Sequence, residues 1–171
     1  MASINLSEWV GAPVERCFLL ATDLPNAAQH IDGIESIELL TDGPVGVGTR
    51  WRETRTMMGR SATEELEVTA FHPPGDPAAG EIAPGQISPG GGVAGGASYT
   101  AECESCGCHF ASTMRFTPEG DGTRVELTLA TRPLSLLAKL MAPASGLMMG
   151  SAKKALQQDL ANLKQAAEAV S

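Results

Sequence analysis

The sequence predicts an α+β fold in which a strongly curved antiparallel sheet wraps around one long C-terminal helix. Residues 34–131 largely alternate apolar and polar side chains, as strands with one buried face do. Residues 149–170 instead repeat apolar side chains at three- and four-residue steps, which is the pattern of an amphipathic helix. A chain of 171 residues, 43% of them hydrophobic, is long enough for one domain with its own core.

The chain begins with a strand and two short helices. Residues 4–10 roughly alternate, which predicts a half-buried strand. Pro13 is a favoured first residue of a helix, and the apolar face of this helix consists of Val14, Cys17, Phe18 and Ala21. The Asp-Leu-Pro sequence at 23–25 predicts the start of a second helix, and Gly33 ends the pair.

About six strands follow. Gly59-Arg60 is interpreted as the two-residue loop of a tight hairpin between 49–58 and 61–71. This loop predicts which inward residues face each other: Trp51 and Val68, Glu53 and Leu66, Arg55 and Glu64, and Met57 and Ala62. The inward face of the hairpin therefore carries three charged residues among apolar ones, namely Glu53, Arg55 and Glu64.

A second hairpin and a further strand complete the sheet. The same alternation puts His109 on the opposite face from the inward residues of this hairpin, which are Tyr99, Ala101, Cys103, Cys108, Phe110, Ser112, Met114 and Phe116. The next strand faces inward with Val125, Leu127 and Leu129. The long helix must cover this face with its apolar stripe of Met149, Ala152, Leu156, Leu160, Leu163, Ala167 and Val170. A short apolar helix is expected before it, at 134–142.

One stretch does not follow these patterns. Residues 73–98 hold eight glycines and five prolines, which is half of the stretch. Such a composition predicts a flexible loop without a core of its own. We therefore expect a single domain over residues 1–171 with a Gly/Pro-rich loop at 73–98.

Charge and targeting signals narrow the function classes. The net charge is −8 and no cluster of Lys or Arg stands out, which argues against nucleic-acid binding. The N-terminus has neither the basic nor the apolar part of a signal peptide. The longest apolar stretch, 134–149, is too short and too interrupted to span a bilayer. A cytoplasmic protein is the default expectation, with cysteines that are reduced, metal-bound or buried rather than disulfide-linked. We expect a monomer or a homodimer.

Five sequence segments carry a resemblance to a known family. They are residues 12–18 (APVERCF), 22–25 (TDLP), 33–38 (GIESIE), 46–51 (GVGTRW) and 120–125 (GDGTRV). The chain resembles the START-like superfamily with the helix-grip fold, also called SRPBCC, and in particular its polyketide cyclase/dehydrase-like branch. Two features depart from the pattern: His30 stands where relatives often have tryptophan, and the loop at 73–98 is unusually long.

The resemblance implies a cavity between the concave sheet and the long helix, where small apolar molecules bind. From alternation we predict a lining of Trp51, Met57, Leu66, Val68, Tyr99, Phe110, Ser112, Met114, Leu127, Met149 and Leu156. Few aromatics and many methionines suit an adaptable space. The alternative is that these residues simply fill a solid core.

The inward charges have two interpretations. Arg55 could bind a ligand carboxylate or phenolate while Glu53 or Glu64 acts as acid or base, because burial raises the pKa of a carboxyl. Alternatively, Arg55 and Glu64 form a structural ion pair, since buried charges are rarely left unpaired. Glu53, Arg55 and Glu64 are therefore the candidate catalytic residues.

A cysteine cluster at 103–109 has the outline of half a zinc site. Tetrahedral zinc needs four ligands, so Cys103, Cys106, Cys108 and His109 would all have to converge. Alternation points His109 away from Cys108. We therefore interpret this segment as a hairpin tip, and expect no metal and no cofactor.

Three functions from different classes fit these observations. The first is a carrier or sensor that binds a small apolar or aromatic ligand. The second is a cyclase or dehydratase acting on a polyketide-like precursor through Arg55 with Glu53 or Glu64. The third is lipid transfer, with 134–149 as a peripheral membrane contact. The alternatives for this segment are a mobile lid and a helix packed over the cavity mouth.

Overall fold

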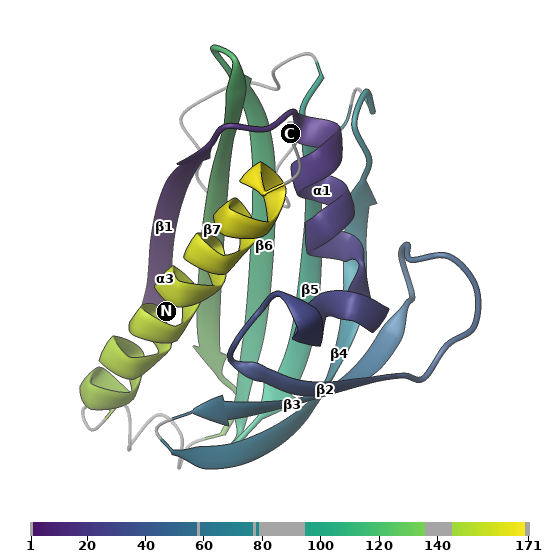
Figure 1. Cartoon of the computed structure of the whole chain (residues 1–171). Coiled ribbons are helices and arrows are strands. Elements are labelled where there is room, and N and C mark those ends of the chain that lie inside the picture. The colour runs from purple at the N-terminus through teal and green to yellow at the C-terminus, as the bar shows by residue number, and fades with distance from the viewer. Residues whose placement is uncertain (1, 58, 77, 79–94, 136–144, 170–171) are drawn as a thin grey trace.

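The computed structural model describes residues 2–57, 59–76, 78, 95–135 and 145–169 (Figure 1). In chain order the elements are β1 (Ala2–Val10), α1 (Val14–Thr22), the 3-10 helix η1 (Leu24–Gln29), β2 (Ile34–Leu39), β3 (Arg50–Met57), β4 (Arg60–His72), β5 (Ala97–Ser105), β6 (Cys108–Glu119), β7 (Gly122–Pro133) and α3 (Ser145–Glu168). The predicted order of a strand, two short helices, six strands and one long helix is confirmed. The predicted helix at 134–142 and the side chains of Met57 and Met149 lie outside the described part of the chain.

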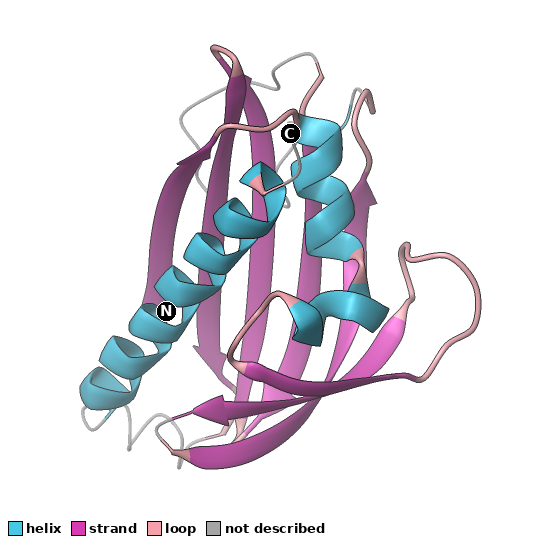
Figure 2. Ribbon diagram, in the orientation of Figure 1, coloured by secondary structure: helices cyan, strands magenta, loops and turns pink. Residues whose placement is uncertain are grey.

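The strands form one antiparallel sheet in the order β1-β7-β6-β5-β4-β3-β2. Neighbouring strands are consecutive in sequence except for β1, which pairs with β7. The sheet curves strongly: β2 and β3 sweep beneath η1, while α3 runs diagonally in front of β1, β7 and β6 with α1 beside its C-terminal end (Figures 1 and 2). The predicted curved sheet around a long helix, with one covered face, is confirmed.

The two N-terminal helices start where the sequence predicted. Pro13 occupies the N-cap with φ −66°, and Val14, Cys17 and Phe18 are buried beneath α1. The second helix begins after Asp23, but it is a 3-10 helix of six residues. The Asp23 carboxylate accepts a hydrogen bond from the side chain of Asn26 at 3.0 Å rather than capping a backbone N–H.

The predicted register of the first hairpin is wrong by two residues. Met57 pairs with Arg60, so Gly59, with φ +72°, takes the second position of the loop instead of the first. Trp51 consequently lies opposite Leu66 rather than Val68, and Glu53 lies opposite Glu64. A shift of two residues keeps every side chain on its predicted face, because side chains alternate with period two. The inward position of Glu53, Arg55 and Glu64 therefore stands, although their partners change.

A β-bulge at Thr69 changes the inward side of β4. Val68 pairs with Ala101, but Ala70 pairs with Thr100 and Phe71 with Tyr99, so one extra residue separates the two halves of the strand. Phe71 thereby turns inward, where its ring lies 5.2 Å from that of Phe18. Alternation alone leaves Phe71 on the outer face.

The start of β7 lies very close to β1. Gly122 lies so close to β1 that a Cβ atom on it would be 2.3 Å from the carbonyl oxygen of Val10 and 2.7 Å from the indole of Trp9. The indole Nε1 donates a hydrogen bond to the carbonyl of Glu119 at 3.2 Å. Only glycine fits at position 122.

Helix α3 is anchored mainly through its C-terminal half. Leu160, Leu163 and Ala167 are buried in the core. The Asn162 amide donates to Asp32 at 3.1 Å, and the Lys164 ammonium donates to the carbonyl of Trp9 at 2.8 Å. Among the helices within the described ranges, none is both long and apolar enough to cross a membrane.

Candidate functional site

Arg55 is at the centre of a charged cluster on the inner face of the sheet. Its Nε lies 2.9 Å from Oε1 of Glu53, and its Nη2 donates a 2.9 Å hydrogen bond to Oδ2 of Asp159 on α3. The three side chains are only 16–18% exposed. The indole of Trp51 donates to the other oxygen of Glu53 at 3.4 Å. The Nε of Arg55 is in ion-pair contact with Glu53 but is not aligned for a hydrogen bond. The cluster thus ties α3 to β3.

Sequence reasoning missed Asp159. The residue lies on the border of the apolar stripe, three positions after Leu156 and four before Leu163, so helical spacing does place it on the covered face. An acidic residue on the covered face of a helix is the sequence signal that could have indicated a charged partner for Arg55. Arg55 pairs with Glu53 and Asp159, whereas the predicted Arg55–Glu64 pair followed from the incorrect register. Glu64 instead accepts a weak 3.9 Å contact from the thiol of Cys103 on β5.

Burial shifts the protonation equilibria of the cluster. It raises the pKa of both Glu53 and Asp159 above their ordinary values, even though Arg55 opposes the shift. Burial disfavours the charge of Arg55 as well, but the carboxylates of Asp159 and Glu53 outweigh it and hold its pKa above the usual value. Arg55 therefore stays positively charged, and the two carboxyls beside it take up protons at a higher pH than ordinary carboxyls do.

The raised pKa of Glu53 predicts that its ionised form weakens folding. A carboxyl with a higher pKa in the folded protein destabilises that state while ionised, and the penalty is relieved as pH falls through the folded pKa. We expect Glu53→Gln to raise the free energy of unfolding at pH 7, and this gain to vanish as pH falls toward the ordinary value of 4.5. Urea unfolding of both proteins across this pH range measures the difference. A variant less stable than wild type at pH 7 contradicts the prediction.

The inward side chains of the sheet become more exposed with distance from α1. At the α1 end, Phe116 and Val125 are completely buried and Met114 and Leu127 nearly so. Further along the same strands, the inward side chains are only half-buried although they face α3: Phe110, Ser112 and Leu129, with Leu156 on the helix itself. Among the described residues, the inward side chains are thus packed as a core at one end of the inner face and partly exposed at the other.

The predicted lining residues divide between these two regions. Trp51, Val68, Met114 and Leu127 belong to the buried core. The other five predicted lining residues whose side chains are described are half-buried. They are Leu66 on β4, Tyr99 on β5, Phe110 and Ser112 on β6, and Leu156 on α3. Burial, together with the Glu53 and Asp159 charges, raises the pKa of Tyr99, whose hydroxyl lies 3.2 Å from the carbonyl oxygen of Ala21.

The cysteine segment is a hairpin tip. Cys106 and Gly107 form its two-residue turn with φ 51° and 73°, and Ser105 pairs with Cys108. His109 lies on the outer face, where its Nε2 is 2.9 Å from Glu102. All four cysteines are free thiols. The described residues contain no group of three or more His, Cys, Asp or Glu side chains placed to hold a metal ion.

Comparison with known proteins identifies the family. Residues 1–168 match the family described as polyketide cyclase/dehydrase and lipid transport. The chain belongs to this family. A search of curated protein sequences finds no match to the chain.

Solved structures of other proteins share the fold of this chain. The protein TTHA0849 from Thermus thermophilus is 23% identical, with 99% of each chain covered and a TM-score of 0.67. The Zhui aromatase/cyclase from Streptomyces sp. R1128 is 17% identical, covering 98% of this chain and 93% of its own, with a TM-score of 0.68. A START superfamily protein from Mycobacterium smegmatis is 15% identical, with 99% of each chain covered and a TM-score of 0.67. The predicted helix-grip fold is confirmed.

Proposed function

We propose that the protein is a carrier or sensor that binds a small, largely apolar or aromatic molecule between the concave sheet and α3. The observation that carries this proposal is the loss of burial along the inner face, from the fully buried Phe116 to the half-buried Phe110 on the same strand. A solid core would bury both residues alike. Apolar, incompletely filled concave surfaces are where small molecules bind.

Polar groups on the same face give the ligand an orientation. The Glu53–Arg55–Asp159 cluster lies at the β3 side of this space. The hydroxyl of Thr131 on the inner side of β7 is buried and has no hydrogen-bond partner among the described residues. Buried hydroxyls normally have partners, so a ligand with hydrogen-bonding groups suits this surface. A few polar groups in an apolar pocket are typical of specific ligand sites.

Filling the half-buried end of the inner face tests the proposal. We expect wild-type protein to bind the uncharged fluorescent probe N-phenyl-1-naphthylamine, and Ser112→Trp to reduce its affinity by about tenfold or more, because the indole occupies the same space. Ala130→Trp is the matched control, since Ala130 lies on the outer face of the neighbouring strand β7. Fluorescence titration measures both affinities. Equal loss in the two variants, or no binding to the wild type, overturns the proposal.

A second candidate function is a cyclase or dehydratase of polyketide-like precursors. The observation that favours it is the raised pKa of Glu53, shifted by burial, beside Arg55, because a carboxyl with a raised pKa exchanges its proton at a higher pH than an ordinary carboxyl and can serve as acid and base. Glu64, on the facing strand, is the alternative proton carrier. An enzyme would change the mass of an aromatic precursor by one water during incubation, whereas a carrier would return it unchanged.

A further inference from the structure

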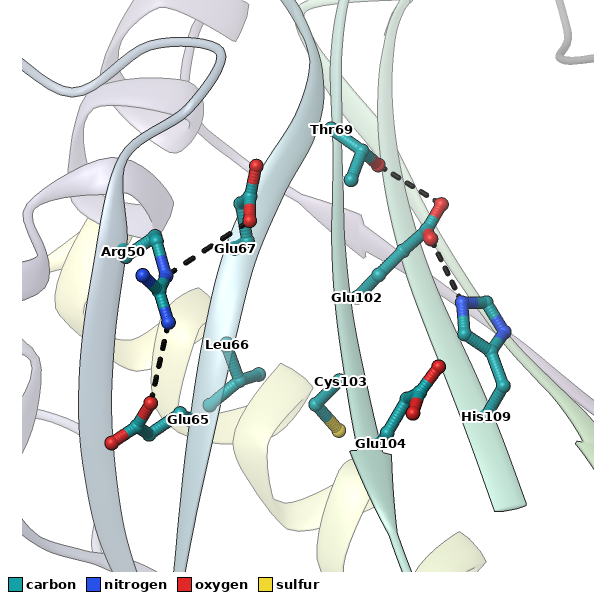
Figure 3. A pocket seen from close by; sticks show the side chains of 9 residues that line it. All are labelled: Arg50, Glu65, Leu66, Glu67, Thr69, Glu102, Cys103, Glu104 and His109. Carbon is teal, nitrogen blue, oxygen red and sulfur yellow. Dashed lines mark hydrogen bonds and ion pairs between the residues drawn. The ribbon is translucent and has the colours of Figure 1, made fainter. Parts of the chain in front are cut away.

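The sheet is split between β4 and β5. The ladder that joins these strands runs from Glu67–Glu102 to His72–Ser98, within the described residues. Residues 60–66 of β4 pair with β3, and residues 103–105 of β5 pair with β6. The bulge at Thr69 explains the divergence, because an extra residue bends the strand that contains it. Beyond the last pair, the two strands separate in Figure 3.

A hollow lies over this split, and its walls come from both faces of the sheet. Most of its lining residues belong to the outer face: Arg50, Glu65, Glu67, Thr69, Glu102, Glu104 and His109. Two others, Leu66 and Cys103, point to the inner face, as their pairing with Trp51 and Phe110 requires. The hollow therefore lies where strand pairing between β4 and β5 is missing, and residues of both faces border it.

The polar cluster lies directly behind the split. Cys103 contacts Glu64, and Glu64 is the strand partner of Glu53, which in turn contacts Arg55. Together with Leu66, these residues join the hollow to the half-buried part of the inner face. The split therefore lies beside residues that lead to the charged cluster of the inner face.

Carboxylates predominate along this route. At the rim, Arg50 faces Glu65 and Glu67, with Glu102 and Glu104 across the split (Figure 3). Behind it, Glu53 and Asp159 already engage the guanidinium of Arg55, so the cation that the described residues place in this cluster is shared with two carboxylates before any anionic ligand arrives. Negative charge repels anions and attracts cations approaching through a narrow passage.

We propose that the split between β4 and β5 is the entrance by which an uncharged or cationic ligand reaches the inner face. This inference rests on the proposed ligand-binding function and adds the route and the charge class of the ligand. An entrance controls rates without changing the final complex. Closing it should therefore slow association and dissociation together and leave the equilibrium affinity unchanged.

A reversible covalent lock tests the route. Glu65 and Glu104 are the next outer-face positions of β4 and β5 beyond the last pair, Glu67–Glu102, so a disulfide between cysteines at these positions would draw the separated strands together without changing an inner-face side chain. In the double variant Glu65→Cys, Glu104→Cys, with Cys106→Ser to remove the exposed native thiol, diamide oxidises the two new thiols to a disulfide and is itself reduced to the hydrazine. We expect the oxidised form to bind N-phenyl-1-naphthylamine about tenfold more slowly than the reduced form in stopped-flow fluorescence, with equal affinity.

A bulky substitution at the split and a charged probe complete the test. Leu66→Trp, which places an indole at the split without any thiol chemistry, should also slow association, whereas Ala130→Trp should not. 8-Anilinonaphthalene-1-sulfonate has the same ring system with one added sulfonate. It should associate more slowly than the uncharged probe, and high salt should reduce the difference.

Three outcomes would contradict these proposals. Unchanged rates in both the disulfide-locked protein and the Leu66→Trp protein, with binding intact, overturn the entrance. Faster association of the sulfonate overturns the charge class. Absence of probe binding to wild type would instead refute the ligand-binding function.

Discussion

Replacing Arg55 with alanine is expected to lower the free energy of unfolding at pH 7 by about 3 kcal/mol or more. Arg55 is the cation in contact with both Glu53 and Asp159, and its loss leaves two largely buried carboxylates facing each other. The destabilisation should shrink on acidification, because carboxyls with raised pKa values can then take up protons and become neutral. Urea unfolding at pH 7 and at pH values below the ordinary 4.5 measures both effects.

Arg52 provides the matched control on the same strand. It also contacts two carboxylates, Glu38 and Glu65, both at 2.7 Å, but on the exposed outer face. We expect Arg52→Ala to change stability by less than about 1 kcal/mol, because water screens exposed ion pairs. Equal effects of Arg55→Ala and Arg52→Ala would show that the inner cluster is not desolvated. If Arg55→Ala lowers stability but leaves probe affinity unchanged, the cluster has a structural role only.

Gly122→Ala adds a single methyl group and is expected to lower the free energy of unfolding by about 3 kcal/mol or more. The new methyl group would lie 2.3 Å from the backbone oxygen of Val10, which cannot move without separating β1 from β7. The indole of Trp9, at 2.7 Å, blocks the alternative displacement. Thermal and urea unfolding of the purified variant measure this loss.

Gly46→Ala is the corresponding control. A Cβ at this position meets nothing within 4 Å, and the backbone there has no left-handed φ. We expect a change within about 0.5 kcal/mol. Similar stability of the two variants would mean that β1 can withdraw from Gly122 at little cost, and that the close approach does not hold this edge of the sheet.

Alternation and helical spacing predicted most of the fold, because both report which side of an element is buried. The inward positions of Glu53 and Arg55 survived an incorrect register, since a shift of two residues preserves the faces of a strand. The inner and outer faces of β5 and β6 were also correct, including His109 on the outer side. The site residues that came from these strands were therefore placed on the correct surface.

Partners that depend on contacts between distant elements were not predictable in this way. Asp159 lies 104 positions after Arg55, and only the diagonal path of α3 over the sheet brings them together. The bulge at Thr69 could not be located from the apolar pattern of β4. Only the structure shows it, through the strand register and the inward position of Phe71. Strand periodicity carries no information about where an extra residue is inserted, because that depends on how neighbouring strands twist.

The long connection between β4 and β5 has a consequence for the order of folding. The hairpins β3–β4, β5–β6 and β6–β7 each close after a two-residue turn, whereas β4 ends at His72 and its partner β5 begins only at Ala97. The entropy lost on closing a loop grows with its length, so local hairpins form before distant strands pair. The β4–β5 ladder is also short and interrupted by a bulge. We therefore expect two meanders to form early, with their docking along β4 and β5 as the late step of folding.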